Sequence, residues 1–249
     1  MSLRILGIIP ARYASSRLPG KPLADIGGRS MVMRVFDQAM KAASLNSVVV
    51  ATDDERIADH VRLHGGHVVM TSPNHPSGTD RCWEALVAIG AESFDAVLNI
   101  QGDEPFIEPE QIDELCMAIS VEGSSIATLA QLVTNDEDLD DAGEVLITTD
   151  IHMHALYFSR TAIPCLRNPK PEPRHTQFRY LKHVGLYAYR TEALSRIIAL
   201  KPSTLEMAES LEQLRWLEHG LKVRIGLTEH PSFCVDTPAD LEEARRRVA

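Results

Sequence analysis

Residues 5–22 read ILGIIPARYASSRLPGKP, an apolar run followed by a cationic loop. The run is rich in β-branched residues and is typical of a buried strand. The loop carries Arg12, Arg17 and Lys21 between three prolines, and each proline fixes φ and restricts the residue before it. The sequence therefore predicts an anion-binding loop, held in few conformations, at the end of a buried strand.

The residue types of this loop suit a polyphosphate. Arg12 and Arg17 can each fork onto phosphate oxygens, Lys21 can act as a point charge, and Gly20 lets the backbone approach a ligand closely. The pattern is not a Walker A loop, which needs Gly, four residues and then Gly-Lys-Ser/Thr. It also lacks Gly-x-Gly-x-x-Gly after the first strand, which disfavours a dinucleotide dehydrogenase.

Composition bounds the class of protein. The chain has 249 residues, 44% hydrophobic and 24% charged, which suits one globular domain with an appendage. Its formal net charge of −10 argues against a nucleic-acid binder. No run of residues resembles a signal peptide or a membrane span, so we expect no membrane partner. The absence of a Cys-x-x-Cys motif fits a cytoplasmic location; the four cysteines are Cys82, Cys116, Cys165 and Cys234.

Apolar runs and helix-like segments alternate along the first half of the chain. This alternation predicts a mostly parallel, Rossmann-like α/β sheet with helices on both faces. Ligands of such sheets bind beyond the carboxyl ends of the strands, so the loops at 10–22, 71–80 and 101–108 should converge. The expected strands are 5–9, 47–51, 67–70, 96–100 and 125–130, and the expected helices lie near 31–42, 54–64, 79–90 and 109–120.

The regular alternation of strand-like and helix-like segments ends at about residue 131. Two strand-like segments around a proline-rich loop predict an inserted subdomain at about 145–190 within a single domain spanning 1–249. The chain then returns to a helix at 204–219, opened by a Ser203-x-x-Glu206 capping box, a strand at 222–227 and a last helix from Thr237-Pro238.

Two aspartates are candidate metal ligands. Asp103 follows a buried strand in the turn QGDEP, and Asp236 lies between a short strand and a helix. Magnesium typically takes one or two protein carboxylates and completes its octahedron with waters and substrate phosphates. Each aspartate alone reads equally well as a turn or capping residue.

Several motifs in the same order resemble the 3-deoxy-manno-octulosonate (KDO) cytidylyltransferase family over nearly the whole chain. They are IPARYASSRLPGKPL at 9–23, ATDD at 51–54, SGTDR at 77–81, QGDEP at 101–105, LYFSR at 156–160, HVGLY at 183–187, SLEQLR at 210–215 and VDTP at 235–238. The resemblance implies a nucleotidyltransferase fold and a homodimer formed with help from the inserted strands. It also implies an enzyme that joins CTP and KDO into CMP-KDO and pyrophosphate for lipopolysaccharide assembly.

The resemblance further implies roles for residues. Arg12 and Lys21 would hold the triphosphate with help from Arg17, and Asp103 and Asp236 would hold Mg²⁺. The sugar's anomeric hydroxyl, made acidic by a metal ion, would attack the α-phosphorus in line. The residues around cytosine and ribose would be Ala11, Ser77, Gly78, Arg81 and Gln101. The sugar-acid pocket would be formed by Arg160, His183, Tyr187, Glu212 and Gln213.

One segment departs from the family pattern, and alternatives remain open. Where the family usually has Pro-Asn-x-x-Lys-Val, residues 141–147 read DAGEVLI, so Leu146 replaces the lysine. The sugar preference could therefore differ, and a sialic acid or an 8-amino octulosonate is an alternative acceptor. A non-catalytic CTP-binding protein is the alternative from another class.

Overall fold

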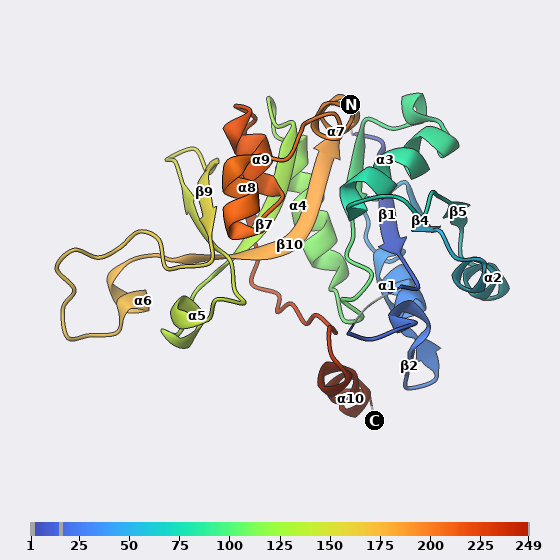
Figure 1. The fold of residues 1–249 in the computed structure, drawn as a ribbon, viewed down its shortest axis with the longest axis horizontal. Helices are drawn as coiled ribbons and strands as arrows, with labels where there is room; N and C mark the ends of the chain where they lie inside the picture. The colour runs from blue at the N-terminus through green and yellow to red at the C-terminus, as the bar shows by residue number, and fades with distance from the viewer. Residues whose placement is uncertain (1–2, 15–16, 249) are drawn as a thin grey trace.

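The computed structural model describes residues 3–14 and 17–248, and this part of the chain contains one nine-stranded sheet with helices on both faces (Figure 1). The strand order is β11-β7-β10-β6-β1-β4-β5, and β8 and β9 extend one end of β10. The strands are β1 (Ile5–Ala11), β4 (Ser47–Thr52), β5 (Val68–Met70), β6 (Ala96–Asn99), β7 (Ile126–Leu132), β8 (Leu146–Thr149), β9 (Ala155–Ser159), β10 (Leu181–Arg190) and β11 (Val223–Leu227).

The sheet is mostly parallel, as the alternating pattern predicts. Strand β1 pairs in parallel with β4 and β6, and β4 pairs in parallel with β5. The long strand β10 is antiparallel to both β6 and β7. A separate small hairpin of β2 (Asp25–Ile26) and β3 (Arg29–Ser30) follows the cationic loop and its 3₁₀ turn at Lys21–Leu23.

Two helical layers bury the two faces of the sheet. Alternate residues of β1 point to opposite faces, so Ile5 and Ile9 join one core cluster while Leu6 and Ile8 join the other. The first cluster lies under α1 (Met31–Ala39), α2 (Glu55–Leu63) and α4 (Pro109–Ser120). The second lies under α3 (Gly78–Ile89), α7 (Thr191–Ile197) and α9 (Gln213–Glu218). The predicted two-faced α/β fold is confirmed.

The helix predicted at 204–219 is wrong as a single element. It is two helices, α8 (Thr204–Glu209) and α9, separated by Ser210, which has left-handed backbone angles with φ 54°. The capping box of Ser203 and Glu206 is present and starts α8. Ser210 ends α8, and the next residue, Leu211, is buried in the core; a tertiary contact of this kind leaves no signal in helical periodicity.

After β7 the chain leaves the main sheet and forms a projection, residues 133–182, which contains two short helices, β8, β9 and the start of β10. The hairpin of β8 and β9 pairs with the start of β10 through β8, whereas the rest of β10 lies inside the main sheet. Strand β8 is absent from the sequence prediction. Leu146, which stands where the family usually has lysine, lies in β8 with 1% exposure and packs with Val133, Leu139 and Tyr180. Its side chain is therefore a core residue of the projection.

The remaining helices lie at the edges of the fold. Short helices α5 (Glu137–Asp140) and α6 (Arg174–Gln177) belong to the projection (Figure 1). The last helix, α10 (Pro238–Arg246), begins at a capping box formed by Thr237 and Asp240 and lies beside the small hairpin. Asp54, the last residue of the ATDD motif, caps α2 by accepting the backbone amide of Arg56. None of the helices in residues 3–14 and 17–248 has both the length and the apolar composition that crossing a membrane requires.

Candidate active site

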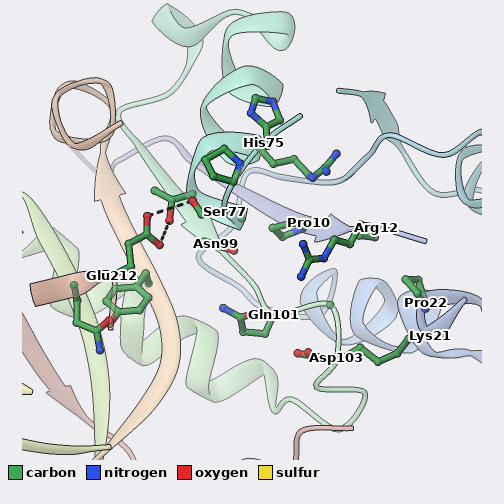
Figure 2. A pocket seen from close by; sticks show the side chains of 18 of the residues that line it. Pro10, Arg12, Lys21, Pro22, His75, Ser77, Asn99, Gln101, Asp103 and Glu212 are labelled. Carbon is green, nitrogen blue, oxygen red and sulfur yellow. Dashed lines mark hydrogen bonds and ion pairs between the residues drawn. The ribbon is translucent and has the colours of Figure 1, made fainter. Parts of the chain in front are cut away.

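A cavity of about 490 Å³ opens at the carboxyl ends of β1 and β6, where the loops at 10–22, 71–80 and 101–108 were expected to converge. Figure 2 shows Arg12, Lys21 and Asp103 toward one end and Ser77 and Glu212 toward the other. The lining residues come from β1, the cationic loop, α3, β6, β10, α9 and the segment before α10. They include Pro10, Ala11, Arg12, Arg17, Lys21, Ser77, Gly78, Thr79, Arg81, Asn99, Gln101, Asp103, Tyr187, Tyr189, Glu212, Gln213, Trp216 and Asp236.

The cationic end is built around Lys21. Its Nζ lies 2.7 Å from Oδ2 of Asp103 and 3.0 Å from Oδ1 of Asp236. A guanidinium nitrogen of Arg17 lies 3.2 Å from the other oxygen of Asp236. Burial alone would lower the pKa of Lys21, but the two carboxylates outweigh it and raise that pKa. Lys21 therefore stays charged where it faces the cavity.

Backbone contacts bring the two aspartates together although they are far apart in sequence. The amide of Val235 donates to the carbonyl oxygen of Asp103 at 2.9 Å. A Cβ at Gly102 would lie 2.8 Å from the carbonyl oxygen of Pro10, so only glycine lets the Asp103 turn lie against the end of β1. Asp236 is fixed from the other side, because its amide donates to the Asp240 carboxylate in the capping box of α10.

The donor set at this end fits a divalent cation. In the described part of the chain, one ligand atom each from Asp103, Cys234 and Asp236 lie within 4.8 Å of one another. Carboxylate oxygens are the ligands that Mg²⁺ prefers, and Lys21 already shows that a positive charge is stabilised between these two aspartates. The residues present are therefore able to hold the metal that the sequence predicts.

The residues predicted around cytosine and ribose all line the cavity, and Ser77 among them reaches the end that carries Glu212. Ser77 caps α3 by accepting the amide of Asp80, and Gly78 begins the helix. Gln101 donates its side-chain amide to the carbonyl oxygen of Gly185 at 2.9 Å. Ala11 and Arg12 lie at the end of β1. These side chains and backbone groups form one continuous wall.

Arg81 is a buried cation in that wall, with 4% exposure. One of its guanidinium nitrogens donates to the Thr71 hydroxyl at 2.5 Å and lies 3.3 Å from a carboxylate oxygen of Asp53. Asp53 comes from the ATDD motif at the end of β4, so this motif orients Arg81 toward the cavity.

The opposite end of the cavity is buried and polar. Glu212 accepts the hydroxyls of Ser77 at 3.2 Å and Thr79 at 3.0 Å (Figure 2). Burial raises the pKa of Glu212, and the Thr79 hydrogen bond opposes that rise. The break at Ser210 separates Glu212 from α8, so that Glu212 occupies the N-cap position of α9 with its side chain free to reach these hydroxyls. Gln213 follows it, with 5% exposure.

Two of the five predicted sugar residues lie outside the cavity lining. Arg160 donates from Nε to the carbonyl oxygen of Glu209 and from a terminal nitrogen to that of Ala142, at 2.8 and 3.2 Å. The His183 ring lies behind Tyr187, with ring centroids 5.2 Å apart. Tyr187, Glu212 and Gln213 line the cavity. The sugar-binding roles of Arg160 and His183 stay predictions that would require either a longer ligand or an indirect contact.

The buried ring of His183 should make the stability of the protein depend on pH. Burial lowers the pKa of the ring to about 3. Its Nε2 lies 3.0 Å from the Thr128 hydroxyl, which is itself 2.6 Å from the Leu186 carbonyl oxygen. The lowered pKa keeps the ring neutral at pH 7. A depressed pKa means that the stability contributed by the neutral ring is present above pH 6.5 and is lost as the pH falls toward 3.

We expect wild type to lose roughly 2 kcal/mol more of its free energy of unfolding between pH 7.5 and pH 5 than His183→Gln does. Urea unfolding at both pH values measures this difference. The exposed His152 provides the control, since His152→Gln should keep the wild-type response. Equal losses in wild type and His183→Gln would show that His183 is not the group that titrates.

Sequence reasoning missed several lining residues. Asn99 ends β6, and Tyr189 and Trp216 come from β10 and α9. Thr79 lies within the recognised SGTDR motif, so its position could have been inferred. His75 also lines the cavity and forms a hydrogen bond with Glu84. It lies in no recognised motif, so nothing in the sequence distinguishes it from the other histidines.

Comparisons with known proteins agree with this geometry. The profile of the family described as cytidylyltransferase matches residues 6–225. The 3-deoxy-manno-octulosonate cytidylyltransferase of Bacteroides thetaiotaomicron is 49% identical over 245 residues, which are 97% of this chain and 97% of that protein. The enzyme of the same name from Geobacter sulfurreducens is 44% identical, with 99% of this chain and 100% of that protein covered.

Solved structures of nucleotidyltransferases are also similar to this chain. A CMP:2-keto-3-deoxy-manno-octonic acid synthetase complexed with CTP has a TM-score of 0.90, 39% identity and coverage of 98% of both chains. A glucose-1-phosphate thymidylyltransferase from Bacillus anthracis, 17% identical with a TM-score of 0.66 and coverage of 98% of this chain and 95% of that one, shares the fold alone. With its profile match, its relatives near half identity and a cavity that suits a nucleotide, this chain belongs to the cytidylyltransferase family.

Proposed function

We propose that the protein transfers CMP from CTP to the anomeric hydroxyl of 3-deoxy-D-manno-octulosonate, giving CMP-KDO and pyrophosphate. The observation that carries the proposal is one cavity with two chemically different ends. One end gathers cations around a pair of carboxylates, and the other is a buried polar pocket that ends in Glu212 and Gln213. A nucleoside triphosphate and a hydroxylated acid need these two environments side by side.

The names of the relatives support this choice of substrates. The two curated relatives named above, covered over 97 and 100% of their length, are 3-deoxy-manno-octulosonate cytidylyltransferases, and the structure with a TM-score of 0.90 is complexed with CTP. In this proposal Arg12, Arg17 and Lys21 bind the triphosphate. The base and ribose contact Ala11, Ser77, Gly78, Arg81 and Gln101.

Asp103 and Asp236 would hold Mg²⁺, which supplies charge neutralisation for the phosphates and acidifies an oxygen bound to it. The protein's own part is positioning and electrostatics. Lys21 and Arg12 keep positive charge beside the phosphates, and the buried pocket orients the acceptor and excludes bulk water. A side chain positioned as a general base is not needed for this arrangement.

The acceptor would lie against Tyr187, Glu212 and Gln213. The carboxylate of Glu212 offers acceptors for sugar hydroxyls, and the Gln213 amide offers both donors and acceptors. Arg160 and His183 are proposed to support this pocket from behind. The product would serve lipopolysaccharide assembly, the use that KDO activation has in the family this chain resembles.

We also infer a cytoplasmic homodimer. Apolar side chains are exposed around the β8–β9 hairpin, where Ile151, Leu156 and Leu132 have exposures of 93, 61 and 53%. Exposed apolar groups that cluster on a projection favour association with another protein surface. Sedimentation equilibrium would support the dimer with a mass near twice the chain mass of 27.6 kDa.

A substrate panel tests the proposal. Pyrophosphate release would be followed with CTP, UTP, ATP and GTP as donors and with KDO, 8-amino-KDO and N-acetylneuraminate as acceptors, with and without Mg²⁺. We expect release with CTP and KDO that depends on Mg²⁺. Release only with another acid would preserve the chemistry and change the acceptor. Tight CTP binding without release from any acid would contradict the enzymatic proposal.

A further inference from the structure

The buried end of the cavity contains a hydrogen-bond donor to which no role has been given. Trp216 lies on α9 with 1% exposure, and its side chain lines the cavity. Within residues 3–14 and 17–248, its indole Nε1 has no hydrogen-bond partner. A buried N–H without a partner costs free energy, so such groups in native structures call for an explanation. A ligand in the cavity would provide the missing acceptor.

The indole is held in place by aromatic neighbours. The ring of Trp216 meets those of Tyr187 and Tyr189 edge to face, with centroids 5.1 and 5.6 Å apart and interplanar angles of 85 and 84°. The two tyrosine rings stack on each other at 6.0 Å. These contacts restrict the rotation of the indole, whose ring lines the cavity while its N–H is buried beneath the surface.

A second polar atom at the cavity supports a ligand. Asn99 is 5% exposed and lines the cavity, and its carbonyl Oδ1 also lacks a partner among the described residues. The hydroxyl of Tyr189 lies near Thr79 without the geometry of a hydrogen bond. The Tyr187 hydroxyl likewise has no partner among the described residues, so four lining residues, Asn99, Tyr187, Tyr189 and Trp216, carry a buried polar atom without one. Such a set of donors and acceptors matches a molecule that carries hydroxyl groups, because a hydroxyl can both donate and accept.

We propose that Trp216 is a specificity-determining residue, whose indole N–H donates a hydrogen bond to a hydroxyl oxygen of the acid bound against Glu212 and Gln213. An indole N–H can only donate a hydrogen bond, so its partner must be an acceptor such as a hydroxyl, ring or carboxylate oxygen. An ammonium group also only donates and cannot be that partner. Trp216 therefore disfavours an amino group at the contacted position. The inference rests on the proposed function and deepens it.

The test compares wild type with Trp216→Phe, which keeps an aromatic ring and removes the N–H. With saturating CTP, we expect the KM for the acid to rise about tenfold, the effect of one lost hydrogen bond to a buried partner. The KM for CTP should stay within about twofold, since the nucleotide lies at the other end. A panel of acceptors would also include analogues of the acid in which one hydroxyl is removed or replaced by an amino group. Compared with wild type, Trp216→Phe should show a smaller ratio of analogue KM to parent KM at a single hydroxyl of the acid, the one that Trp216 contacts.

The second tryptophan supplies a matched control and a readout that needs no turnover. Trp83 packs on the core outside the cavity lining, and the chain has only two tryptophans, so Trp83→Phe leaves Trp216 as the single tryptophan, which can be excited at wavelengths that tyrosine does not absorb. Its fluorescence should change on adding the acid to the protein with a non-hydrolysable CTP analogue. Trp83→Phe should also keep the wild-type KM for the acid.

The possible outcomes distinguish a failure of the role of Trp216 from a failure of the proposed function. An unchanged KM for the acid in Trp216→Phe, or an equal rise in both KM values with a lowered Tm, would overturn the role of Trp216. Unchanged fluorescence of Trp83→Phe in the presence of an acid that wild type turns over would overturn it as well. Absence of pyrophosphate release by wild type with every acid would instead refute the proposed function, and a fluorescence response would then still support an acid-binding site.

Discussion

Replacing Lys21 with methionine is expected to lower kcat/KM for CTP by about 10³-fold, the scale seen when one preorganised charge-stabilising group is removed. Lys21 is the cation nearest to both candidate metal ligands, at 2.7 Å from Asp103 and 3.0 Å from Asp236. Methionine keeps much of the side-chain length and removes only the charge. Steady-state kinetics with varied CTP measures the loss.

A matched control is available in Lys41, which lies at the exposed end of α1 and donates to Gln38. Lys41→Met should keep the wild-type kcat/KM. Lys21→Met should also bind Mg²⁺ without CTP at least as tightly as wild type, because the ammonium group that competes for the same carboxylates is gone. Unimpaired turnover, or Mg²⁺ binding that weakens, would contradict this account of Lys21.

Replacing Asp103 with asparagine is expected to lower kcat by about 10³-fold or more at a fixed, physiological Mg²⁺ concentration. The substitution keeps the shape of the side chain and removes one of the two carboxylates that fit a divalent cation. A titration of kcat against Mg²⁺ should show a half-saturating concentration shifted upward. The Tm should change little, because Val235 is held by the backbone carbonyl of Asp103 rather than by its side chain.

Glu110 is the control for this substitution, since it is an exposed carboxylate on α4, outside the cavity lining. Glu110→Gln should have the wild-type response to Mg²⁺. If Asp103→Asn retained wild-type turnover at low Mg²⁺, the metal site would have to be placed elsewhere.

The features of the fold that sequence predicted are those with local causes. Alternating apolar residues such as Ile5 and Leu6 define a strand with two buried faces, and the proline-bounded loop after it defines the cationic end of the cavity. The convergence of Asp103 with this loop follows from the general rule that ligand-binding loops gather at the carboxyl ends of parallel strands. These features need no knowledge of distant contacts.

The features that sequence did not predict depend on distant contacts. The break at Ser210 exists because Leu211 is buried and Glu212 reaches the hydroxyls of α3, yet the segment reads as one amphipathic helix. Trp216 has the pattern of an ordinary core residue, and only the structure shows that it lines a cavity while its buried N–H has no partner among the described residues. Arg160 was assigned from its motif, and its observed partners are backbone carbonyls.

Phosphorus NMR of the wild-type protein with CTP, KDO and Mg²⁺ tests the central claim most directly. The account predicts that the three CTP resonances decline together while one phosphodiester resonance grows and the pyrophosphate resonance grows to twice its area, because pyrophosphate carries two equivalent phosphorus atoms. The account also predicts that omission of KDO stops the change. Persistence of the CTP signals in the presence of KDO, or their decay to CMP and pyrophosphate without any diester, would contradict it.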